Sequence, residues 1–355
     1  MPKILFIAPY PFGEAPSQRF RFEQYKTILE EEHDVEYSPF YSLKIWEILY
    51  QKGKNTQKTF LLLSAYCRRF ILLFKLRKYD YIFVHREIAP MGPPIFEFLL
   101  AKICKRKYIY DFDDAIWLPN YSKANSKFQF LKSYWKVKYI IKWADKVTVG
   151  NEYLANYARQ FNKNVEVIPT TIDTENYHTV LTDHTQEKVV IGWTGSHSTM
   201  KYLDFFYPII AELEQKYDFT FRIISDKNPE VKLKSLEFVK WNKATEIEDL
   251  SKIHIGVMPL VDNQWARGKC GFKGLQYMAL EVVSVMSPVG VNQTIVQNGK
   301  NGFLANTPEE WKDILIDLLK DAEKRKEIGK NGRIRVIEAY SVLSQKEKYL
   351  RLFKA

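Results

Sequence analysis

The sequence predicts an α/β protein with two parallel β-sheets, and three observations carry this prediction. Short runs rich in valine and isoleucine alternate with longer helical patterns along the whole chain, which is typical of βαβ units. The chain has 355 residues, about twice the length of an ordinary domain, so we expect two domains. Hydrophobic residues make up 46% and charged residues 27%, which indicates a folded globular protein and excludes a fibrous or disordered chain.

The predicted strands follow one another with helical patterns between them. The first apolar run, residues 4–8, superficially resembles a secretory leader, but it is short and meets Pro9 and Pro11, so we interpret it as a buried strand. The first half contains the predicted strands 4–8, 35–39, 81–84, 108–110, 147–149 and 165–168. The second half contains the predicted strands 189–193, 220–224, 236–239, 255–258 and 282–286.

One polar stretch separates the two sets of strands. Residues 173–188 show neither helical nor alternating periodicity, so they are the best candidate for a linker. We therefore predict a first Rossmann-like domain over residues 1–185 and a second over residues 186–335. The remaining residues, 336–355, are predicted to form a C-terminal helix.

Charge and cysteine content narrow the classes of partner and compartment. The formal net charge of +11 favours polyanionic partners such as nucleic acid, acidic lipid or phosphorylated substrates. No RNP, KH or helix-turn-helix pattern accompanies the basic residues, so we expect no nucleic-acid partner. The three cysteines are an odd number without a CxxC pair, so they suggest neither a disulfide framework nor a zinc site and fit a reducing cytosol.

The basic excess is concentrated in residues 44–78, where Glu47 is the only acidic residue. Phenylalanines and leucines are interleaved with the lysines and arginines, and the most apolar part is too short and too charged to span a bilayer. Such a segment can lie in an anionic membrane interface. The alternative, which we prefer from the pattern alone, is a helix that covers a sheet and has one solvated face.

Residues 268–279 form the most informative motif of the chain. Two glycines, the second of them Gly271, permit close backbone approach at an expected helix N-terminus, whose free N–H groups suit a phosphate. In a continuous helix Lys269, Lys273 and Gln276 share one face, with two ammonium groups near the anion and an amide available to a hydroxyl. The spacing fits a nucleoside diphosphate site and equally a glycine-broken surface helix with two solvated lysines.

A second glycine turn follows the predicted strand 189–193. Gly195 and Ser196 lead into an expected helix, and Lys201 supplies a positive charge. Both glycine motifs therefore fall at the C-terminal ends of strands, where open α/β sheets bind ligands. Neither matches GxxxxGK[ST], so the sequence does not support a P-loop NTPase.

An ordered set of motifs across nearly the whole chain resembles the retaining family-4 glycosyltransferases, also called glycosyl transferases group 1. This resemblance implies the GT-B fold, in which two Rossmann-like domains face one another across a cleft, and implies that the C-terminal helix crosses back to the first domain. The motifs are residues 3–11 (KILFIAPYP), 17–21 (SQRFR), 85–87 (HRE), 110–117 (YDFDDAIW), 165–170 (VEVIPT), 192–196 (GWTGS), 255–260 (IGVMPL), 272–279 (FKGLQYMA), 287–290 (SPVG) and 298–304 (NGKNGFL).

The resemblance implies that the second domain binds a nucleotide sugar. It gives Lys201 and Lys273 a catalytic role, because they would stabilise the charge that develops on the leaving diphosphate. The family's donor helix usually carries two glutamates eight positions apart, and this chain has Gly268 and Gln276 there. The implied donor-binding residues are Gly195, Ser196, Lys201, Lys269, Gly271, Phe272, Lys273 and Gln276.

The resemblance also implies that the first domain binds the acceptor. A family histidine that contacts the transferred sugar is matched here by Asp113, to which we assign a catalytic role. Carboxylates beside Trp117 can orient sugar hydroxyls or act as a base. The DxD-like string could also bind a divalent metal, but this family offsets diphosphate charge with lysine, arginine and helix dipoles, so we expect no metal and no cofactor. The implied acceptor-binding residues are Arg19, Arg21, His85, Asp111 and Asp114.

The expected function is therefore transfer of a sugar from a nucleotide-diphosphate sugar to a glycan or lipid-linked acceptor, with retention of configuration, in cell-surface polysaccharide or glycolipid synthesis. The expected location is the cytoplasm, with peripheral contact at the inner face of the cytoplasmic membrane. Two alternatives stay open. A sugar-nucleotide epimerase with the GT-B fold would consume donor without acceptor, and a non-catalytic nucleotide-sugar-binding protein would explain Gly268 and Asp113.

Overall fold

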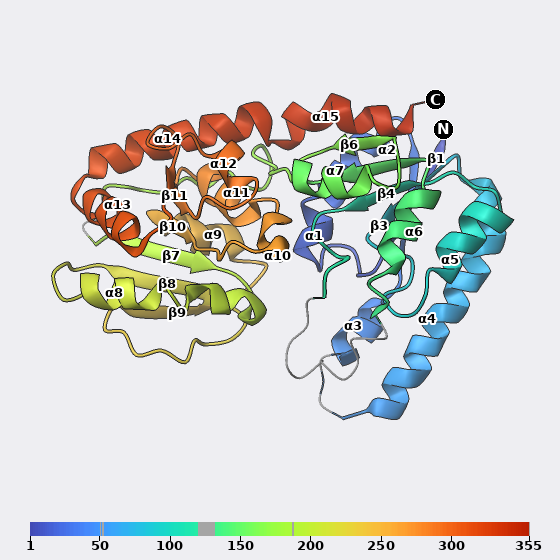
Figure 1. The fold of residues 1–355 in the computed structure, drawn as a ribbon, viewed down its shortest axis with the longest axis horizontal. Coiled ribbons are helices and arrows are strands. Elements are labelled where there is room, and N and C mark those ends of the chain that lie inside the picture. The colour runs from blue at the N-terminus through green and yellow to red at the C-terminus, as the bar shows by residue number, and fades with distance from the viewer. Residues whose placement is uncertain (50, 52, 120–131, 187, 355) are drawn as a thin grey trace. The chain divides into compact units, whose positions relative to one another are not determined.

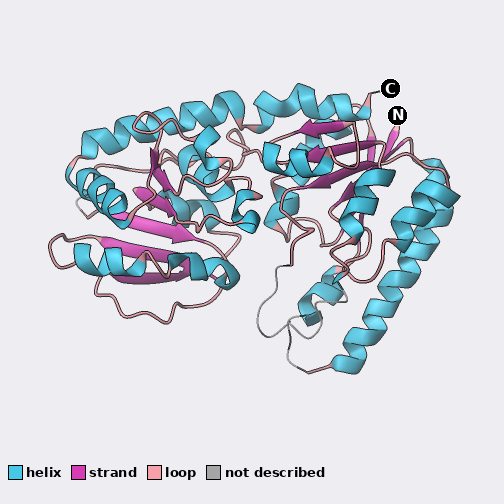
Figure 2. Ribbon diagram, viewed as in Figure 1, coloured by secondary structure: helices cyan, strands magenta, loops and turns pink. Residues whose placement is uncertain are grey.

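The computed structural model describes residues 1–355 except 50, 52, 120–131, 187 and 355. The chain divides into two compact units, each built from a parallel sheet with helices on its faces (Figures 1 and 2). Unit 1 comprises Met1–Thr170 together with Lys346–Ala355. Unit 2 comprises Thr171–Gln345.

The sheet of unit 1 has six parallel strands in the order β2-β1-β3-β4-β5-β6. Its central strands β1 and β4 are buried almost throughout because both faces of the sheet are covered by helices. The strands are β1 (Lys3–Ala8), β2 (Asp34–Pro39), β3 (Tyr81–His85), β4 (Ile109–Phe112), β5 (Lys146–Val149) and β6 (Val165–Val167).

The helices of unit 1 differ greatly in length. The longest, α4 (Asn55–Lys75), has 21 residues and buries Ala65 and Arg69 against the unit. Lys52 and Tyr50, in the basic segment that precedes α4, lie outside the described residues. The other helices are α1 (Pro16–Arg19), α2 (Lys26–Glu30), α3 (Leu43–Leu49), α5 (Ile95–Phe98), a π-helical turn at Leu99–Ile103, α6 (Lys136–Trp143) and α7 (Glu152–Ala158), with 3-10 turns at Glu23–Tyr25 and Leu76–Lys78.

The sheet of unit 2 also has six parallel strands, in the order β12-β11-β10-β7-β8-β9. A core around Trp193, Phe206 and Trp311 fills one face, and the rings of Phe206 and Trp311 lie 5.1 Å apart. The strands are β7 (Val190–Thr194), β8 (Thr220–Ser225), β9 (Leu236–Lys240), β10 (Ile255–Met258), β11 (Val283–Met286) and β12 (Phe303–Leu304).

Local sequence signals set the helix ends of unit 2. Thr307 and Glu310 form a capping box around Pro308 at the start of α13, and the Asp321 side chain caps the next helix. The helices are α8 (Tyr207–Leu213), α9 (Glu246–Ser251), α10 (Gln264–Arg267), α11 (Phe272–Ala279), α12 (Asn292–Ile295), α13 (Pro308–Lys320) and α14 (Ala322–Ala339), with a 3-10 helix at His197–Leu203.

All eleven predicted strands overlap observed ones, and the two-residue β12 is the strand that the sequence did not reveal. The division between the units falls at Thr170 and not near residue 185. The polar segment after Thr170 is bonded into unit 2, because the Thr182 N–H donates to the Leu280 carbonyl at 2.9 Å and His184 Nε2 donates to the Glu281 carbonyl at 2.9 Å. Polarity was therefore a poor guide to the boundary.

The C-terminal segment is two helices instead of one. α14 ends at Ala339, and α15 (Val342–Leu350) begins after Ser341, which pairs with Ile172 in an isolated β-bridge. A final 3-10 turn covers Arg351–Phe353. The last residues belong to unit 1, where the rings of Tyr349 and Tyr25 stack at 4.0 Å.

Candidate functional site

The strand order of unit 2 places a ligand site between β7 and β10. From β7 the chain adds β8 and β9 on one side, and from β10 it adds β11 and β12 on the other side, so the direction in which strands are added reverses at this pair. Open α/β sheets bind ligands outside the carboxyl ends of their strands at such a switch point. Two chain segments emerge there, one after Thr194 and one after Met258. They carry both glycine motifs that the sequence singled out.

Lys273 is the central side chain of this site. It lies in the first turn of α11, with Nζ 4.3 Å from the centre of the Trp193 ring and 3.5 Å from Thr199 Oγ1. Burial, reinforced by the positive charge of Lys269, holds the pKa of Lys273 well below its usual range. No carboxylate in the described part of the chain contributes to that shift, so the ammonium group lacks a counter-charge.

Two more lysines lie near a second aromatic ring, that of Tyr202. Lys269 Nζ lies 5.9 Å and Lys201 Nζ 5.6 Å from the centre of the Tyr202 ring. Lys269 precedes α11, which begins at Phe272, so the prediction that it shares a face of that helix with Lys273 is wrong. The positive charge of Lys269 nonetheless lowers the pKa of Lys273. The site is an accumulation of positive charge over aromatic rings, which favours a polyanion.

Glycine is required at both turns of the site. A β-carbon on Gly195 would lie 2.6 Å from Lys273 Nζ and 2.6 Å from the Trp193 ring, so any side chain would displace the ammonium group. Gly271 is the N-cap of α11 with φ +69°, and a β-carbon there would lie 2.2 Å from Ile295. The N-terminus of α11 therefore has no side-chain cap, which suits it to an anion.

The turn after β7 is held from the neighbouring strand. The Asp226 carboxylate, just beyond β8, accepts from the His197 N–H at 2.6 Å and also pairs with its ring. Ser196 Oγ lies 2.8 Å from Ser198 Oγ, so the two hydroxyl groups share a hydrogen bond within the turn. The sequence assigned no role to His197, because its partner is 29 residues away and only the sheet brings them together.

Gln276, predicted to bind the donor, lies in the same helix as Lys273 but is buried. Its side chain is 1% exposed, and Nε2 is 3.5 Å from Nε2 of the buried His178. Every residue of α11 from Gly274 to Ala279 is buried, since the helix is covered on all sides. Gln276 is therefore closed to solvent in this structure, and its contact with the donor ribose stays a prediction.

In unit 1 the predicted acceptor residues fall into two groups. The first is a buried network around Asp111, whose carboxylate accepts from Thr148 Oγ1 at 2.8 Å and from His85 Nδ1 at 2.8 Å and pairs with the Arg21 guanidinium. Burial alone would raise the pKa of Asp111, but Arg21 and His85 lower it well below its usual range. Arg21, predicted to bind the acceptor, is 3% exposed and also donates to the Ile168 carbonyl, so its charge lies in the interior of unit 1.

The second group is more open. Arg86 Nε donates to Asp113 Oδ1 at 2.9 Å, and its Nη2 donates to Asp114 Oδ2 at 2.7 Å. Burial opposes the charge of Arg86, but the two carboxylates outweigh it and raise the pKa of Arg86. The three carboxylates after β4 thus separate, with Asp111 in the interior and Asp113 and Asp114 in ion pairs with Arg86. Sequence reasoning missed Arg86, although its position beside His85 was the available signal.

The loop after β1 carries a further unpredicted group. The Glu23 carboxylate accepts from the Gly13 N–H at 2.7 Å and from Gln18 Nε2 at 3.0 Å. Burial raises the pKa of Glu23 to about 7, although these hydrogen bonds oppose the shift. Glu23 is therefore part of the loop's interior and not of a surface ion pair, while Arg19 lies beside it, half-buried, with its guanidinium over the Phe20 ring.

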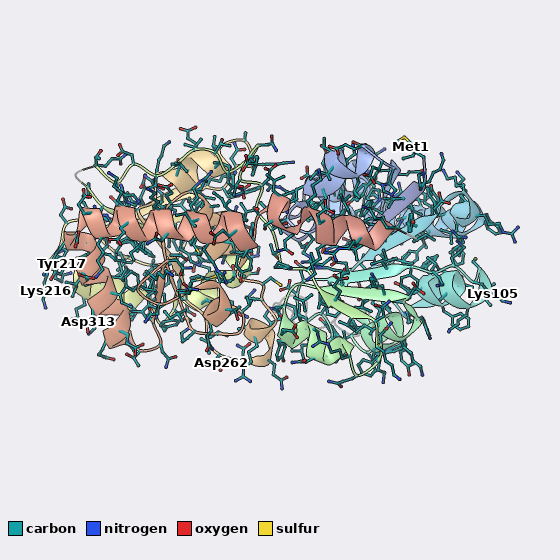
Figure 3. All side chains as sticks on the ribbon, turned by 90° about the horizontal axis from the view of Figure 1, so that it is seen from above. Met1, Lys105, Lys216, Tyr217, Asp262 and Asp313 are labelled. Carbon is teal, nitrogen blue, oxygen red and sulfur yellow. The ribbon has the colours of Figure 1, made fainter. Side chains whose placement is uncertain are left out.

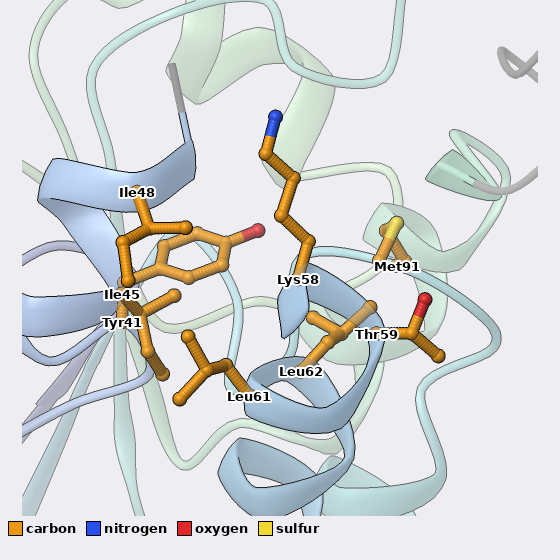
Figure 4. A pocket seen from close by; sticks show the side chains of 8 residues that line it. All are labelled: Tyr41, Ile45, Ile48, Lys58, Thr59, Leu61, Leu62 and Met91. Carbon is orange, nitrogen blue, oxygen red and sulfur yellow. The ribbon is translucent and has the colours of Figure 1, made fainter. Parts of the chain in front are cut away.

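Unit 1 also contains an apolar cavity of about 190 Å³. Figure 4 shows it between α3 and the first turns of α4, with the Lys58 side chain along one edge. The lining residues are Tyr41, Ile45, Ile48, Lys58, Thr59, Leu61, Leu62 and Met91. Among the described residues no group of three or more histidine, cysteine, aspartate or glutamate side chains is arranged to hold a metal ion.

The comparisons with known proteins agree with this architecture. Residues 188–321 match the model of the family glycosyl transferases group 1. Sucrose-phosphate synthase from Thermosynechococcus elongatus superposes with a TM-score of 0.71 at 14% identity, over 99% of each chain. Anabaena HepE, solved with UDP and glucose, gives a TM-score of 0.65 at 16% identity, also over 99% of each chain. The chain has the GT-B fold.

A glycosyltransferase from Rickettsia africae has the same fold, with a TM-score of 0.66 at 13% identity over 99% of this chain and 98% of that chain. Among curated proteins none matches this sequence. The structural likenesses confirm the predicted α/β class with two Rossmann-like parallel sheets. The matched family model covers β7 to α13, the part of unit 2 that contains the lysine site.

Proposed function

We propose that this protein is a glycosyltransferase that moves a sugar from a nucleotide-diphosphate sugar to a hydroxyl of a glycan or lipid-linked acceptor, with retention of configuration. One observation carries the proposal. The partly buried Lys273 ammonium group has no carboxylate partner among the described residues and adjoins the uncapped N-terminus of α11, in the segment that matches a glycosyltransferase family. A diphosphate supplies the negative charge that this site lacks.

The lysines account for donor activation. When the bond between sugar and diphosphate breaks, negative charge grows on the leaving phosphate, and Lys273, Lys269 and Lys201 stabilise it. Preorganised cations in a site with little water act strongly on such a charge. The acceptor hydroxyl attacks from the face that the diphosphate leaves, and the departing phosphate takes the hydroxyl proton. The complex of HepE with UDP-glucose supports a uridine nucleotide as the first donor to try.

Unit 1 supplies the acceptor contacts in this proposal. Asp113 and Asp114 accept hydrogen bonds from sugar hydroxyls while Arg86 fixes their orientation. His85, Asp111 and Arg21 hold the strand ends that carry these groups, because they are buried and bonded to one another. The apolar cavity beside Lys58 supports a lipid-linked acceptor, since an amine next to an apolar cavity suits a phosphate joined to a hydrocarbon chain.

A binding panel tests the donor half of the proposal. Thermal shifts with UDP, GDP, ADP and CMP identify the base, because a ligand of the native state raises the melting temperature. Lys273→Met is expected to weaken binding of the selected diphosphate at least about tenfold, which corresponds to about 1.4 kcal/mol. Lys216→Met, which removes an exposed lysine of unit 2 (Figure 3), is the matched control. If none of the four nucleotides binds, the proposal is contradicted.

A second candidate, a nucleotide-sugar-binding protein without catalytic activity, is favoured by Gln276. Its burial against His178 removes the side chain that the family resemblance assigns to the donor ribose. Mass spectrometry of reactions that contain the selected sugar nucleotide and a panel of glycan and polyprenyl-phosphate acceptors separates the two functions. Transfer to any acceptor that ceases in Lys273→Met establishes the enzyme, whereas donor binding without product across the panel favours the binding protein.

A further inference from the structure

Helix α4 carries two apolar faces, and only one of them is buried in unit 1. Ala65, Arg69 and Leu76, which follows the helix, face the interior. The opposite side exposes large apolar side chains, with Phe60 72% and Phe74 87% exposed. The exposed apolar residues of α4 are Phe60, Leu63, Phe70, Ile71 and Phe74.

These five residues form a single stripe. Successive residues of an α-helix are rotated by about 100°, so offsets of 3, 10, 11 and 14 positions from Phe60 return to the same side within about 100°. Cys67 lies inside this stripe and is also exposed. The stripe runs almost the whole length of α4, and it cannot be core because the core face of the helix lies on the other side.

Neighbouring helices of unit 1 carry further aromatic side chains, some of them exposed. The Phe70 ring contacts Phe96 of α5 at 4.8 Å, and Phe98 of α5 contacts Trp143 of α6 at 5.5 Å. Tyr139 follows at 5.7 Å from Trp143, and Trp135 lies 5.7 Å from Tyr139. Among these residues Phe70, Phe98, Tyr139 and Trp135 are exposed. We call the stripe and these aromatic side chains the α4–α6 face.

Positive charge surrounds the α4–α6 face. No acidic residue occurs between Glu47 and Asp80, so the cations of α4 have no acidic neighbour in sequence. Arg68 donates to the Phe40 carbonyl, which leaves its charge uncompensated by that bond. Figure 3 shows Lys105 extending outward beyond the π-helical turn. The exposed basic residues of the face are Arg68, Lys75, Arg77, Lys102, Lys105, Lys138 and Lys142.

We propose that the α4–α6 face docks on the surface of an anionic lipid bilayer. Exposed phenylalanine, tryptophan and tyrosine side chains enter the boundary between headgroups and acyl chains, and the surrounding lysines and arginines pair with lipid phosphates. No helix within the described residues is long and apolar enough to cross a membrane, so α4 would lie along the surface. The basic residues around the face favour an anionic membrane over a second copy of the protein, because two copies of this face would bring like charges together.

Vesicle flotation with the full chain tests the proposal. We expect the protein to float with vesicles of phosphatidylcholine and phosphatidylglycerol, much less with phosphatidylcholine alone, and less again as salt is raised. The variant Phe60→Ser, Leu63→Ser, Phe74→Ser is expected to lower the bound fraction at least about tenfold. Its matched control replaces three exposed apolar residues of unit 2, Val180, Val261 and Leu343, by serine and should bind as the wild type does.

Circular dichroism and a melting curve establish that both variants are folded. Failure of the wild type to bind anionic vesicles overturns the proposal, and so does equal binding by the Phe60, Leu63, Phe74 variant. A wild-type dimer that this variant converts to a monomer, measured by light scattering, would assign the face to a second copy instead. None of these outcomes depends on nucleotide binding, so they are separate from the test of the proposed function.

A probe on Cys67 reports the orientation of the helix directly. Cys270 is buried and Cys104 is exposed, so Cys104→Ser leaves Cys67 as the reactive thiol for an environment-sensitive fluorophore. On anionic vesicles the emission should shift to the blue and be quenched by brominated acyl chains. A fluorophore on Leu343→Cys, in a chain that lacks both exposed cysteines, should do neither. If the protein binds the vesicles and the emission of the fluorophore on Cys67 does not change, the proposal is contradicted.

Discussion

The substitution Gly195→Ala tests the geometry of the lysine site. The added methyl group would lie 2.6 Å from both Lys273 Nζ and the Trp193 ring, whereas ordinary van der Waals contacts begin at 3.4 Å. Trp193 is 1% exposed and packed in the core of unit 2, so the lysine tip is the group that moves. The clash is steric, because the backbone of Gly195 does not lie in the left-handed region.

The magnitude follows from the contact that is lost. Displacing Lys273 by roughly an ångström breaks one hydrogen bond between an ammonium group and a phosphate, worth about 1.5–3 kcal/mol. That corresponds to a diphosphate affinity about 10- to 150-fold weaker, measured by calorimetry. Overpacking should also lower the free energy of unfolding by about 1–3 kcal/mol.

Gly192→Ala is the matched control for this prediction. A β-carbon there would lie 2.4 Å from Ile253, so the variant is overpacked within β7, three residues before Gly195, without touching Lys273. It should lose stability and keep its affinity for diphosphate at temperatures where it is folded. Wild-type affinity in Gly195→Ala together with weakened binding in Lys273→Met would refute the reasoning, because the glycine would then not shape the cation's position.

Three further predictions concern charge. Diphosphate binding should be coupled to proton uptake by Lys273, because the anion raises the lowered pKa of this residue, and calorimetry over a range of pH in buffers of different ionisation enthalpy should show uptake in the wild type and none in Lys273→Met. Burial lowers the pKa of His254 from 6.5 to about 4, so the unfolded chain binds the extra proton and unfolding free energy should fall by at most about 3 kcal/mol as pH drops from 6.5 to 4. His254→Gln should flatten that slope in urea titrations, and an unchanged slope would exclude His254 as its source. Asp111→Asn should cost about 3–5 kcal/mol in the same assay, since it leaves Arg21 buried without a counter-charge, whereas a loss below about 1 kcal/mol would show that the network is not structural.

The fold was predictable because parallel strands buried on both faces are continuous apolar runs. β12 was not predicted because its two residues, Phe303 and Leu304, are too few to show the apolar run of a buried strand. The polar segment after Thr170 was misassigned because its backbone and side-chain bonds to unit 2 are invisible in composition.

The site was predictable in part. Glycine turns after strands located Gly195, Gly271 and Lys273 correctly near one another, because strand order fixes where those turns meet. Spacing could not give the start of α11, and the assumption of a helix from residue 268 wrongly placed Lys269 on one helix face with Lys273 and Gln276. Likewise, adjacent aspartates in sequence could not reveal that a turn sends Asp111 inward and Asp113 to Arg86.

Hydrogen–deuterium exchange with and without a saturating nucleoside diphosphate tests the central claim most directly, because it locates the bound diphosphate on the chain. Amides of the turn after β7, residues 195–203, and of residues 268–276 at the start of α11 should exchange more slowly in the complex. These segments should show no change in Lys273→Met at the same ligand concentration. Protection confined to unit 1, or slower exchange in unit 2 only outside both segments, would contradict the assignment of the lysine site to the diphosphate.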